Sequence, residues 1–129
     1  MLPAQFRLKK RGLFQRVYSR RLIIRNDQFT LQVLPRFKDK LSLSQNPPNP
    51  LIGFVISKKI VKKACLRNKS KRKIREAVRV LIQENVEFSQ SLSKWYAMVF
   101  IIIKDLKDIS FTELKQALIN TVKLAKEKY

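Results

Sequence analysis

The sequence predicts an α+β fold in which helices pack against a small sheet, and three patterns lead to this prediction. Residues 28–34 (QFTLQVL) alternate apolar and polar side chains, as a strand with one buried and one wet face does. Residues 51–56 and 96–103 are short apolar runs, which is typical of buried strands. Elsewhere, apolar residues recur every three or four positions, and this spacing predicts helices.

Three helices are predicted. The first covers about residues 12–20, and its helical spacing extends to Leu22. The second includes about residues 70–86, where Ile74, Val78, Leu81 and Ile82 form an apolar stripe. The last begins at Ser110, because residues 110–113 spell the capping box S-x-x-E.

Two segments are predicted to lack regular structure. Residues 40–50 contain three prolines and several polar residues, so we expect a loop between two strands. Residues 89–94 are interpreted as a turn. The length of 129 residues and the absence of internal repeats indicate a single domain over residues 1–129.

The charge balance is the most unusual property of the chain. Lys and Arg total 29 against nine acids, which gives a formal net charge of +20. Such self-repulsion destabilises a compact state, so a polyanion is expected to offset it, and nucleic acid is the leading candidate. Eleven of the basic residues lie between Lys58 and Arg79, with Glu76 as the one acid. A solvated helix face usually mixes signs, so this cluster predicts a nucleic-acid surface, without indicating DNA or RNA.

The basic cluster begins before the apolar stripe of the second helix. Extending the helical spacing backwards places Arg67, Ser70 and Lys71 on the continuation of that stripe. The first turns of this helix are therefore expected to project past the core or to contact something polar and negative.

Several classes of protein are disfavoured by composition. The chain has no His, which removes the usual general base and the commonest zinc ligand, and its acids are scattered. Only two glycines are present, too few for a glycine-rich phosphate loop. We therefore expect no catalytic residue and no metal ligand in this chain.

The expected location is the cytoplasm. The longest apolar run, residues 96–103, has eight residues, whereas a membrane-spanning helix needs roughly 20. The first residues contain no apolar block typical of a secretory signal. The lone Cys65 cannot form an internal disulfide and suits a reducing compartment.

Residues 57–79, SKKIVKKACLRNKSKRKIREAVR, resemble the signature of the bacterial ribonuclease P protein family. That signature reads S-K-K, a short spacer, then R-N-R-x-K-R-x-x-R-E-x-x-R. The resemblance continues in R-L-K-K at 7–10, F-Q-R-V-Y at 14–18, F-x-L at 29–31 and S-F-x-E-L at 110–114. It therefore covers nearly the whole chain.

The resemblance implies a fold and a function. The fold would be a mixed sheet of about four strands against three helices, in αβββαβα-like order, with a left-handed βαβ crossover. The protein would be the non-catalytic subunit of ribonuclease P, which removes the 5′ leader of precursor tRNA. Its partners would be the ribonuclease P RNA, which carries the chemistry with Mg²⁺ held mainly by that RNA, and precursor tRNA. Neither DNA nor a membrane is expected as a partner.

The resemblance also implies two sets of site residues. The catalytic RNA would be contacted by Lys58, Lys59, Lys63, Arg67, Asn68, Lys69, Lys71, Arg72 and Arg75. The leader would lie in a cleft between the sheet and the first helix, against Arg11, Phe14, Tyr18 and Gln32. Aromatic faces stack on unpaired bases without demanding a sequence, although the pattern by itself favours core packing for the two aromatic residues.

The chain departs from the family pattern at four places, one of which is the spacer at residues 60–66, where the glycine of some members is missing. Lys69 replaces the second Arg of R-N-R, which keeps the charge but loses the bidentate fork. Lys104 and Asp105 stand where Arg-Pro is common, and residues 44–50 look like a local insertion.

Three alternative functions remain open at this point. A ribosomal or other structural RNA-binding protein would bind ribosomal RNA and leave tRNA ends unchanged. A self-sufficient nuclease would cleave RNA alone and depend on an acid such as Glu76. A basic membrane-surface protein would bind liposomes without preferring RNA.

Overall fold

The structure is a computed structural model that describes residues 8, 11–35, 50–92 and 94–129. Its elements in chain order are α1 (Arg11–Arg20), β1 (Leu22–Arg25), β2 (Phe29–Pro35), β3 (Leu51–Ile56), α3 (Ala64–Glu84), α4 (Val86–Leu92), β4 (Trp95–Ile102) and α5 (Phe111–Lys128). The predicted loop 40–50 lies outside the described residues except for Pro50, and so does the R-L-K-K segment except for Leu8.

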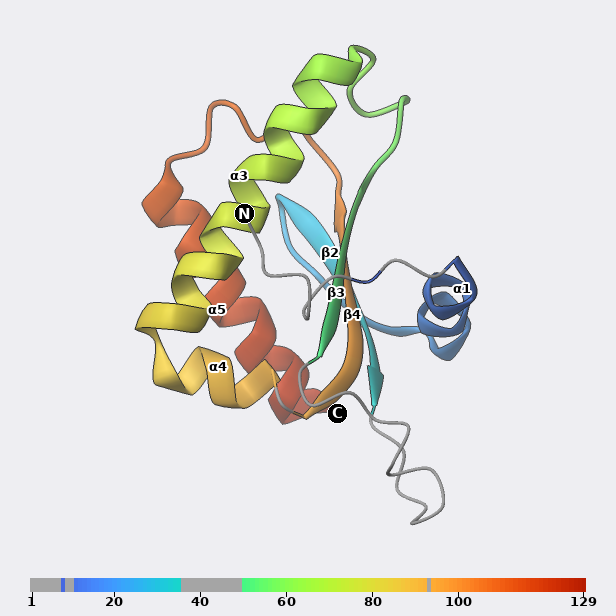
Figure 1. Cartoon of the computed structure of the whole chain (residues 1–129), viewed down its shortest axis with the longest axis vertical. Helices are drawn as coiled ribbons and strands as arrows, with labels where there is room; N and C mark the ends of the chain where they lie inside the picture. Colours follow the sequence, from blue (N-terminus) through green and yellow to red (C-terminus); the bar gives the residue numbers. More distant parts are fainter. Residues whose placement is uncertain (1–7, 9–10, 36–49, 93) are drawn as a thin grey trace.

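The four strands form one mixed sheet in the order β1-β2-β4-β3. β2 is antiparallel to β1 and β4, whereas β3 is parallel to β4, with Ile56 opposite Ile102. In Figure 1, α1 covers one face of the sheet, and α3, α4 and α5 cover the other. The predicted α+β class and mixed sheet are thus confirmed.

The sheet separates two apolar clusters. The larger cluster lies between the sheet and the three helices α3, α4 and α5, and it includes the fully buried Phe29, Trp95 and Phe100. The smaller one lies on the α1 face and includes Val17 and Val99. β3 and β4 are buried on both faces over part of their length, which explains why they are continuous apolar runs.

The connection from β3 to β4 runs through α3 and α4. In Figure 1, β3 is drawn in front of β4, both strands run upward, and α3 lies to their left. This arrangement is a left-handed crossover, as the resemblance implied, whereas general topology rules favour the right-handed form.

The N-terminal helix α1 ends at Arg20, as predicted, although the helical spacing of apolar residues continues to Leu22. Arg21 has φ of 54°, the left-handed conformation that commonly ends helices, and its N–H donates to the Tyr18 carbonyl. Leu22, assigned to the helical stripe from sequence, instead opens β1. The spacing was misleading here because a buried strand residue can follow a helix at a helical interval.

The number of helices was also wrong, because residues predicted as a turn at 89–94 lie largely in α4. Asn85 separates α3 from α4, and its Oδ1 accepts the N–H of Phe88 at 2.9 Å. Phe88 and Leu92, four residues apart, are both buried and anchor the short helix in the main core. The chain therefore has four helices within its described residues, not three.

The remaining predictions agree with the structure within a few residues. The capping box is confirmed on its Ser side, because Ser110 Oγ accepts the Glu113 N–H at 3.1 Å. The basic helix α3 runs from Ala64 to Glu84, so it contains most of residues 70–86, predicted as helical, together with the basic turns before them. Within the part of the chain described, no helix is long and apolar enough to cross a membrane.

Candidate nucleic-acid interface

The basic segment lies where β3 ends and α3 begins. A turn follows β3, in which the N–H groups of Ile60 and Val61 donate to the Ser57 carbonyl. Lys58, Lys59 and Lys63 of this segment are exposed. The first turn of α3 contains no acid and its Lys63 cap makes no side-chain hydrogen bond, so the partial positive charge of the helix N-terminus adds to the lysines.

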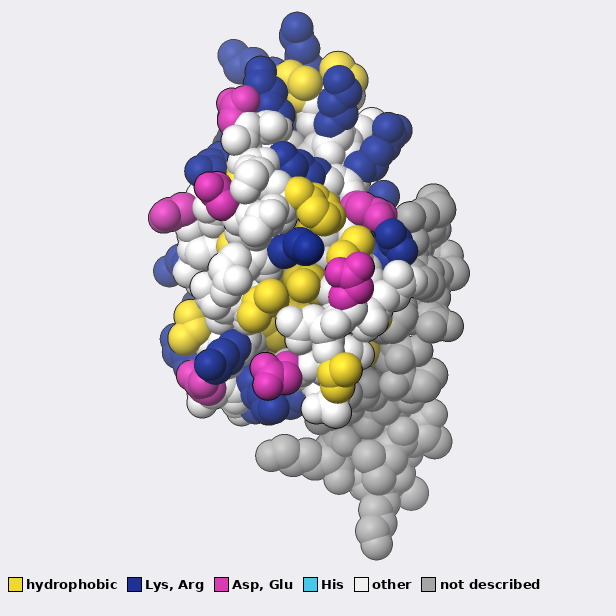
Figure 2. Space-filling view, turned by 90° about the vertical axis from the view of Figure 1, so that its left-hand side faces the viewer, with side chains coloured by type: hydrophobic (Ala, Val, Ile, Leu, Met, Phe, Trp, Pro, Cys, Tyr) yellow, Lys and Arg dark blue, Asp and Glu magenta, His cyan; other side chains and the backbone are white. Residues whose placement is uncertain are grey.

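Figure 2 shows how these charges are distributed on the face that carries the helices. Lys and Arg side chains dominate the upper end, where α3 begins in Figure 1, whereas Asp and Glu side chains mix with them lower down. The one-signed surface predicted from sequence is thus concentrated at one end of the molecule.

Arg67 is half-buried and is held by the turn before it. Its Nη1 donates to the carbonyls of Val61 at 3.0 Å and Lys62 at 2.7 Å. A guanidinium has five N–H donors, so groups on Nε and Nη2 can still reach a phosphate. Arg67 therefore orders the lysine-rich turn in addition to carrying charge.

The other motif residues differ in exposure. Asn68, Lys69 and Arg72 are exposed, whereas Lys71 and Arg75 are half-buried. The Arg75 guanidinium lies 5.8 Å from the centroid of the Phe54 ring, a cation–π distance that fixes it above the edge strand β3.

Glu76, the one acid of the cluster, binds Arg79. Arg79 Nε donates to both carboxylate oxygens at 3.0 Å. These hydrogen bonds from Arg79 lower the pKa of Glu76 from 4.5 to about 2. Arg79 is thus engaged within its own helix.

Ser70 and Lys73 point away from this surface, toward the segment that follows β4. Ser70 is buried, and its Oγ donates to Asp105 Oδ1 at 3.2 Å and accepts the Leu106 N–H at 3.1 Å. Lys73 Nζ donates to the Leu106 carbonyl at 2.8 Å and to the Ile109 carbonyl. The first turns of the basic helix were expected either to project past the core or to contact something polar and negative. Ser70 makes a contact of the second kind, with the Asp105 carboxylate.

The second predicted set lies across the sheet, on the α1 face. Arg11 is exposed at the start of α1, and Tyr18 is 36% exposed near its end. The half-buried Phe14 lies 6.4 Å from Tyr18 between ring centroids. Burial raises the pKa of the Tyr18 phenol above its ordinary value. Val17, between these two residues in the sequence, is fully buried.

Gln32 lies on the same face of the sheet as α1. Its neighbours Leu31 and Val33 belong to the main core on the other face, and it is flanked in the sheet by Ile23 and Val99. Gln32 Oε1 is buried without a hydrogen-bond partner among the described residues. The Gln32 residue as a whole is half-buried. Its unpaired oxygen is an acceptor that is available to a hydrogen-bond donor once the side chain moves slightly.

The residues predicted to contact the catalytic RNA and those predicted to contact the leader lie on two separate surfaces. The sheet lies between α1 and α3 (Figure 1), so the leader set and the motif set face different sides. Lys58 and Lys59, just beyond the end of β3, lie at the edge of the sheet between these surfaces.

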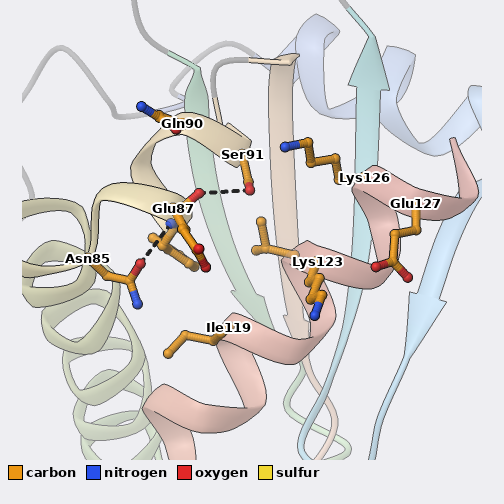
Figure 3. Close-up of a pocket in the computed structure, with 10 residues that line it drawn as sticks. Asn85, Glu87, Gln90, Ser91, Ile119, Lys123, Lys126 and Glu127 are labelled. Carbon is orange, nitrogen blue, oxygen red and sulfur yellow. Dashed lines mark hydrogen bonds between the residues drawn. The ribbon is translucent and has the colours of Figure 1, made fainter.

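A pocket of about 490 Å³ between α4 and α5 was not indicated by the sequence. Figure 3 shows Glu87 on one side and Lys123, Lys126 and Glu127 on the other. Because its charged groups are of both signs, this pocket does not suit a polyanion. No group of three or more potential metal-binding side chains occurs among residues 8, 11–35, 50–92 and 94–129.

The helix α3, whose first turns are basic, follows the parallel edge strand β3, and α1 with its two aromatic residues covers the opposite face of the sheet. These features define a small basic α+β protein with a mixed sheet. Residues 2–126 match the sequence model of the Ribonuclease P family, and the chain belongs to this family.

Two relatives illustrate the similarity. The ribonuclease P protein component of Rippkaea orientalis is 43% identical over 81 residues, which cover 63% of this chain and 61% of that protein. The Rickettsia canadensis protein component is 32% identical over 97 residues, covering 75% of this chain and 78% of the relative. The match thus spans less than two thirds of the Rippkaea protein and more than two thirds of the Rickettsia protein.

Solved structures share the fold. The Staphylococcus aureus RNase P protein superimposes with a TM-score of 0.69 at 28% identity, covering 94% of this chain and 95% of the other. A mutant of that protein, described as defective in mRNA degradation activity, also has a TM-score of 0.69, at 29% identity, covering 94% and 88%. These values show that the fold described above is shared with the solved RNase P proteins.

Proposed function

We propose that this chain is the protein subunit of a ribonuclease P ribonucleoprotein and that it promotes removal of the 5′ leader from precursor tRNA. The observation that carries the proposal is the family match over residues 2–126, combined with the one-signed charge of residues 57–75. The protein would act without catalytic residues of its own, by binding the catalytic RNA and the leader.

The motif surface suits an RNA backbone. Exposed lysines at the end of β3, together with Arg72 on α3, would neutralise phosphates and release counterions. Arg67, held by two backbone carbonyls, would present its remaining donors in a fixed orientation. This surface would therefore contact the ribonuclease P RNA.

The α1 face suits an unpaired strand. Tyr18 is partly exposed and Phe14 is half-buried, so both would be able to contact bases of the leader. Base stacking on an aromatic side chain contributes about 1–3 kcal/mol per base and tolerates any sequence. Arg11 would add a phosphate contact, and Gln32 would supply an amide beside the rings.

Mg²⁺ is assigned mainly to the RNA. Within the described residues, the carboxylates and Cys65 form no cluster of three that could hold the ion. The contribution of the protein would be to offset repulsion between the two RNA molecules, which lowers the Mg²⁺ concentration that the assembly needs. A cytoplasmic location, with neither DNA nor membrane as a partner, completes the proposal.

The test is cleavage of a radiolabelled precursor tRNA at low, near-physiological Mg²⁺. One tube contains a bacterial ribonuclease P RNA with the protein, a second contains the RNA, and a third contains the protein. Correct 5′ maturation in the first tube only is the expected result. Unchanged cleavage on adding the protein would overturn the proposal.

The third tube also addresses the nuclease alternative. Because the mutant Staphylococcus aureus protein is described as defective in mRNA degradation activity, the protein should be incubated with an mRNA as well as with the precursor. Cleavage by the protein without RNA partner would support a nuclease. Stable co-purification with ribosomal RNA, without an effect on tRNA ends, would support the ribosomal alternative.

A further inference from the structure

Two residues one turn apart on α3 hold the segment between β4 and α5. This segment, residues 103–110, is called the β4–α5 loop below. Ser70 binds it through Asp105 Oδ1 and the Leu106 N–H, and Lys73 binds it through the Leu106 and Ile109 carbonyls. The contacts join residues 33 to 36 positions apart in the chain, so they are tertiary and not part of the helix.

The attachment is buried. Ser70 is 2% exposed and Leu106 is fully buried in the main core. A buried hydroxyl that loses such partners is left unsatisfied, which disfavours a detached loop. The loop is therefore held as a fixed part of the α3 surface.

Ser70 and Lys73 occupy positions that the R-N-R-x-K-R-x-x-R-E signature leaves open. Their neighbours Lys69 and Arg72 are exposed, because successive residues on a helix point about 100° apart. One face of this helix thus displays the basic motif while an adjacent face binds the loop. Lys73 is withdrawn from the charged surface, although the sequence places it in the middle of the basic cluster.

The bound loop brings two more lysines to the motif. Asp105 Oδ1 accepts a hydrogen bond from Ser70 Oγ and a second one, at 3.0 Å, from the Lys107 N–H. Lys104 and Lys107 are exposed. Since Ile56 pairs with Ile102 in the parallel ladder, Lys58 and Lys104 each follow by two residues and leave the sheet at the same end.

We infer that Ser70 and Lys73 are positioning residues that hold the β4–α5 loop so that Lys104 and Lys107 extend the motif surface and bind RNA phosphates. The inference rests on the proposed function and adds to it a contact that lies outside the signature. Lys73 itself does not contact the RNA.

The direct test measures the affinity of the full-length protein for a bacterial ribonuclease P RNA transcript over a series of salt concentrations. The variant carries Lys104→Gln and Lys107→Gln. Loss of two phosphate contacts should weaken binding about 5- to 20-fold and reduce the salt slope by roughly 1.5. The control carries Lys123→Gln and Lys126→Gln on α5, which removes the same charge from a mixed-sign region and should have a much smaller effect.

The positioning role is tested with Ser70→Ala, which removes no charge. It should reduce the salt slope, whereas a change in folding stability would lower the active fraction without changing that slope. Ser70→Thr keeps the hydroxyl and should restore binding. Adding Lys104→Gln and Lys107→Gln to Ser70→Ala should weaken binding less than in the wild-type background, because the loop is already displaced. A thermal melt of each variant confirms that it folds.

Wild-type affinity in the Lys104→Gln, Lys107→Gln variant would overturn the inference. Full additivity with Ser70→Ala would overturn the positioning role. Arg72→Ala, measured alongside, separates these failures from that of the proposed function. If Arg72→Ala also binds like wild type, the proposed RNA surface itself is wrong.

Discussion

The ring of Phe14 lies on the backbone of Gly53, so closely that a Cβ atom at position 53 would be 2.6 Å from both Cε1 and Cζ of the ring. α1 can therefore approach β3 only because this strand position lacks a side chain. The same contact sets the height at which the ring stands above the sheet.

Replacing Gly53 by Ala should displace Phe14 and lower the free energy of unfolding by about 1–3 kcal/mol, as overpacking typically does. Chemical denaturation measures this change. Gly12→Ala is the matched control, because nothing lies within 4 Å of a Cβ at that position in α1, and it should be neutral or stabilise by up to about 1 kcal/mol. Equal stability of the two variants would contradict the contact.

Replacing Tyr18 by Ala should raise KM for precursor tRNA with a long leader, about fivefold or more, and change KM little for a one-nucleotide leader. Steady-state cleavage of both substrates by the reconstituted ribonucleoprotein measures the difference. Phe111→Ala is a suitable control, because Phe111 is equally exposed, at 36%, but lies on α5. An equal effect of Tyr18→Ala on both substrates would assign Tyr18 to the core.

Arg67 and Arg72 should respond differently to replacement by Ala. Both variants should bind the ribonuclease P RNA more weakly, with a flatter salt dependence, because phosphate contacts are lost. Only Arg67→Ala should also lower stability, by about 1–3 kcal/mol, because it removes the donors to the Val61 and Lys62 carbonyls.

Filter binding and thermal denaturation separate these two effects. Arg79→Ala removes the same charge from the same helix, but its guanidinium is held by Glu76, so RNA binding should change less. If Arg79→Ala weakens binding as much as Arg72→Ala does, net charge and not position decides the affinity.

The Glu76–Arg79 pair should make stability depend on acidity. Because the folded-state pKa of Glu76 is lowered from 4.5 to about 2, its contribution is present above pH 4.5 and is lost as the pH falls toward 2. Glu76→Gln should therefore flatten the fall in unfolding free energy over this interval. Urea denaturation at several pH values measures it, with Glu87→Gln on α4 as control; an unchanged profile in Glu76→Gln would contradict the pair.

The sequence was sufficient for features that depend on near neighbours. Alternation in residues 28–34 and apolar runs at 51–56 and 96–103 mark the three longer strands, because burial of a strand face requires that pattern. Ser110 marks the start of α5 for a similarly local reason, since its hydroxyl caps a group three residues away. The motif 57–79 also identified the family, which residues 2–126 confirm.

Short elements needed the tertiary structure. β1 has four residues, too few for a pattern. It begins directly after the turn at Arg21 and is held in place by its pairing with β2. α4 has seven residues and depends on burial of Phe88 and Leu92 in a core assembled from distant segments. Isolated segments of this length are not stable by themselves, so their local sequence carries little information.

The same division applies to the candidate site. From the sequence alone, every basic residue between Lys58 and Arg79 belongs to one charged cluster. Only the tertiary structure separates the exposed Arg72 from Lys73, whose ammonium binds carbonyls more than 30 positions away. Charge is a property of each side chain, whereas its availability depends on which distant backbone groups the fold brings within hydrogen-bonding distance.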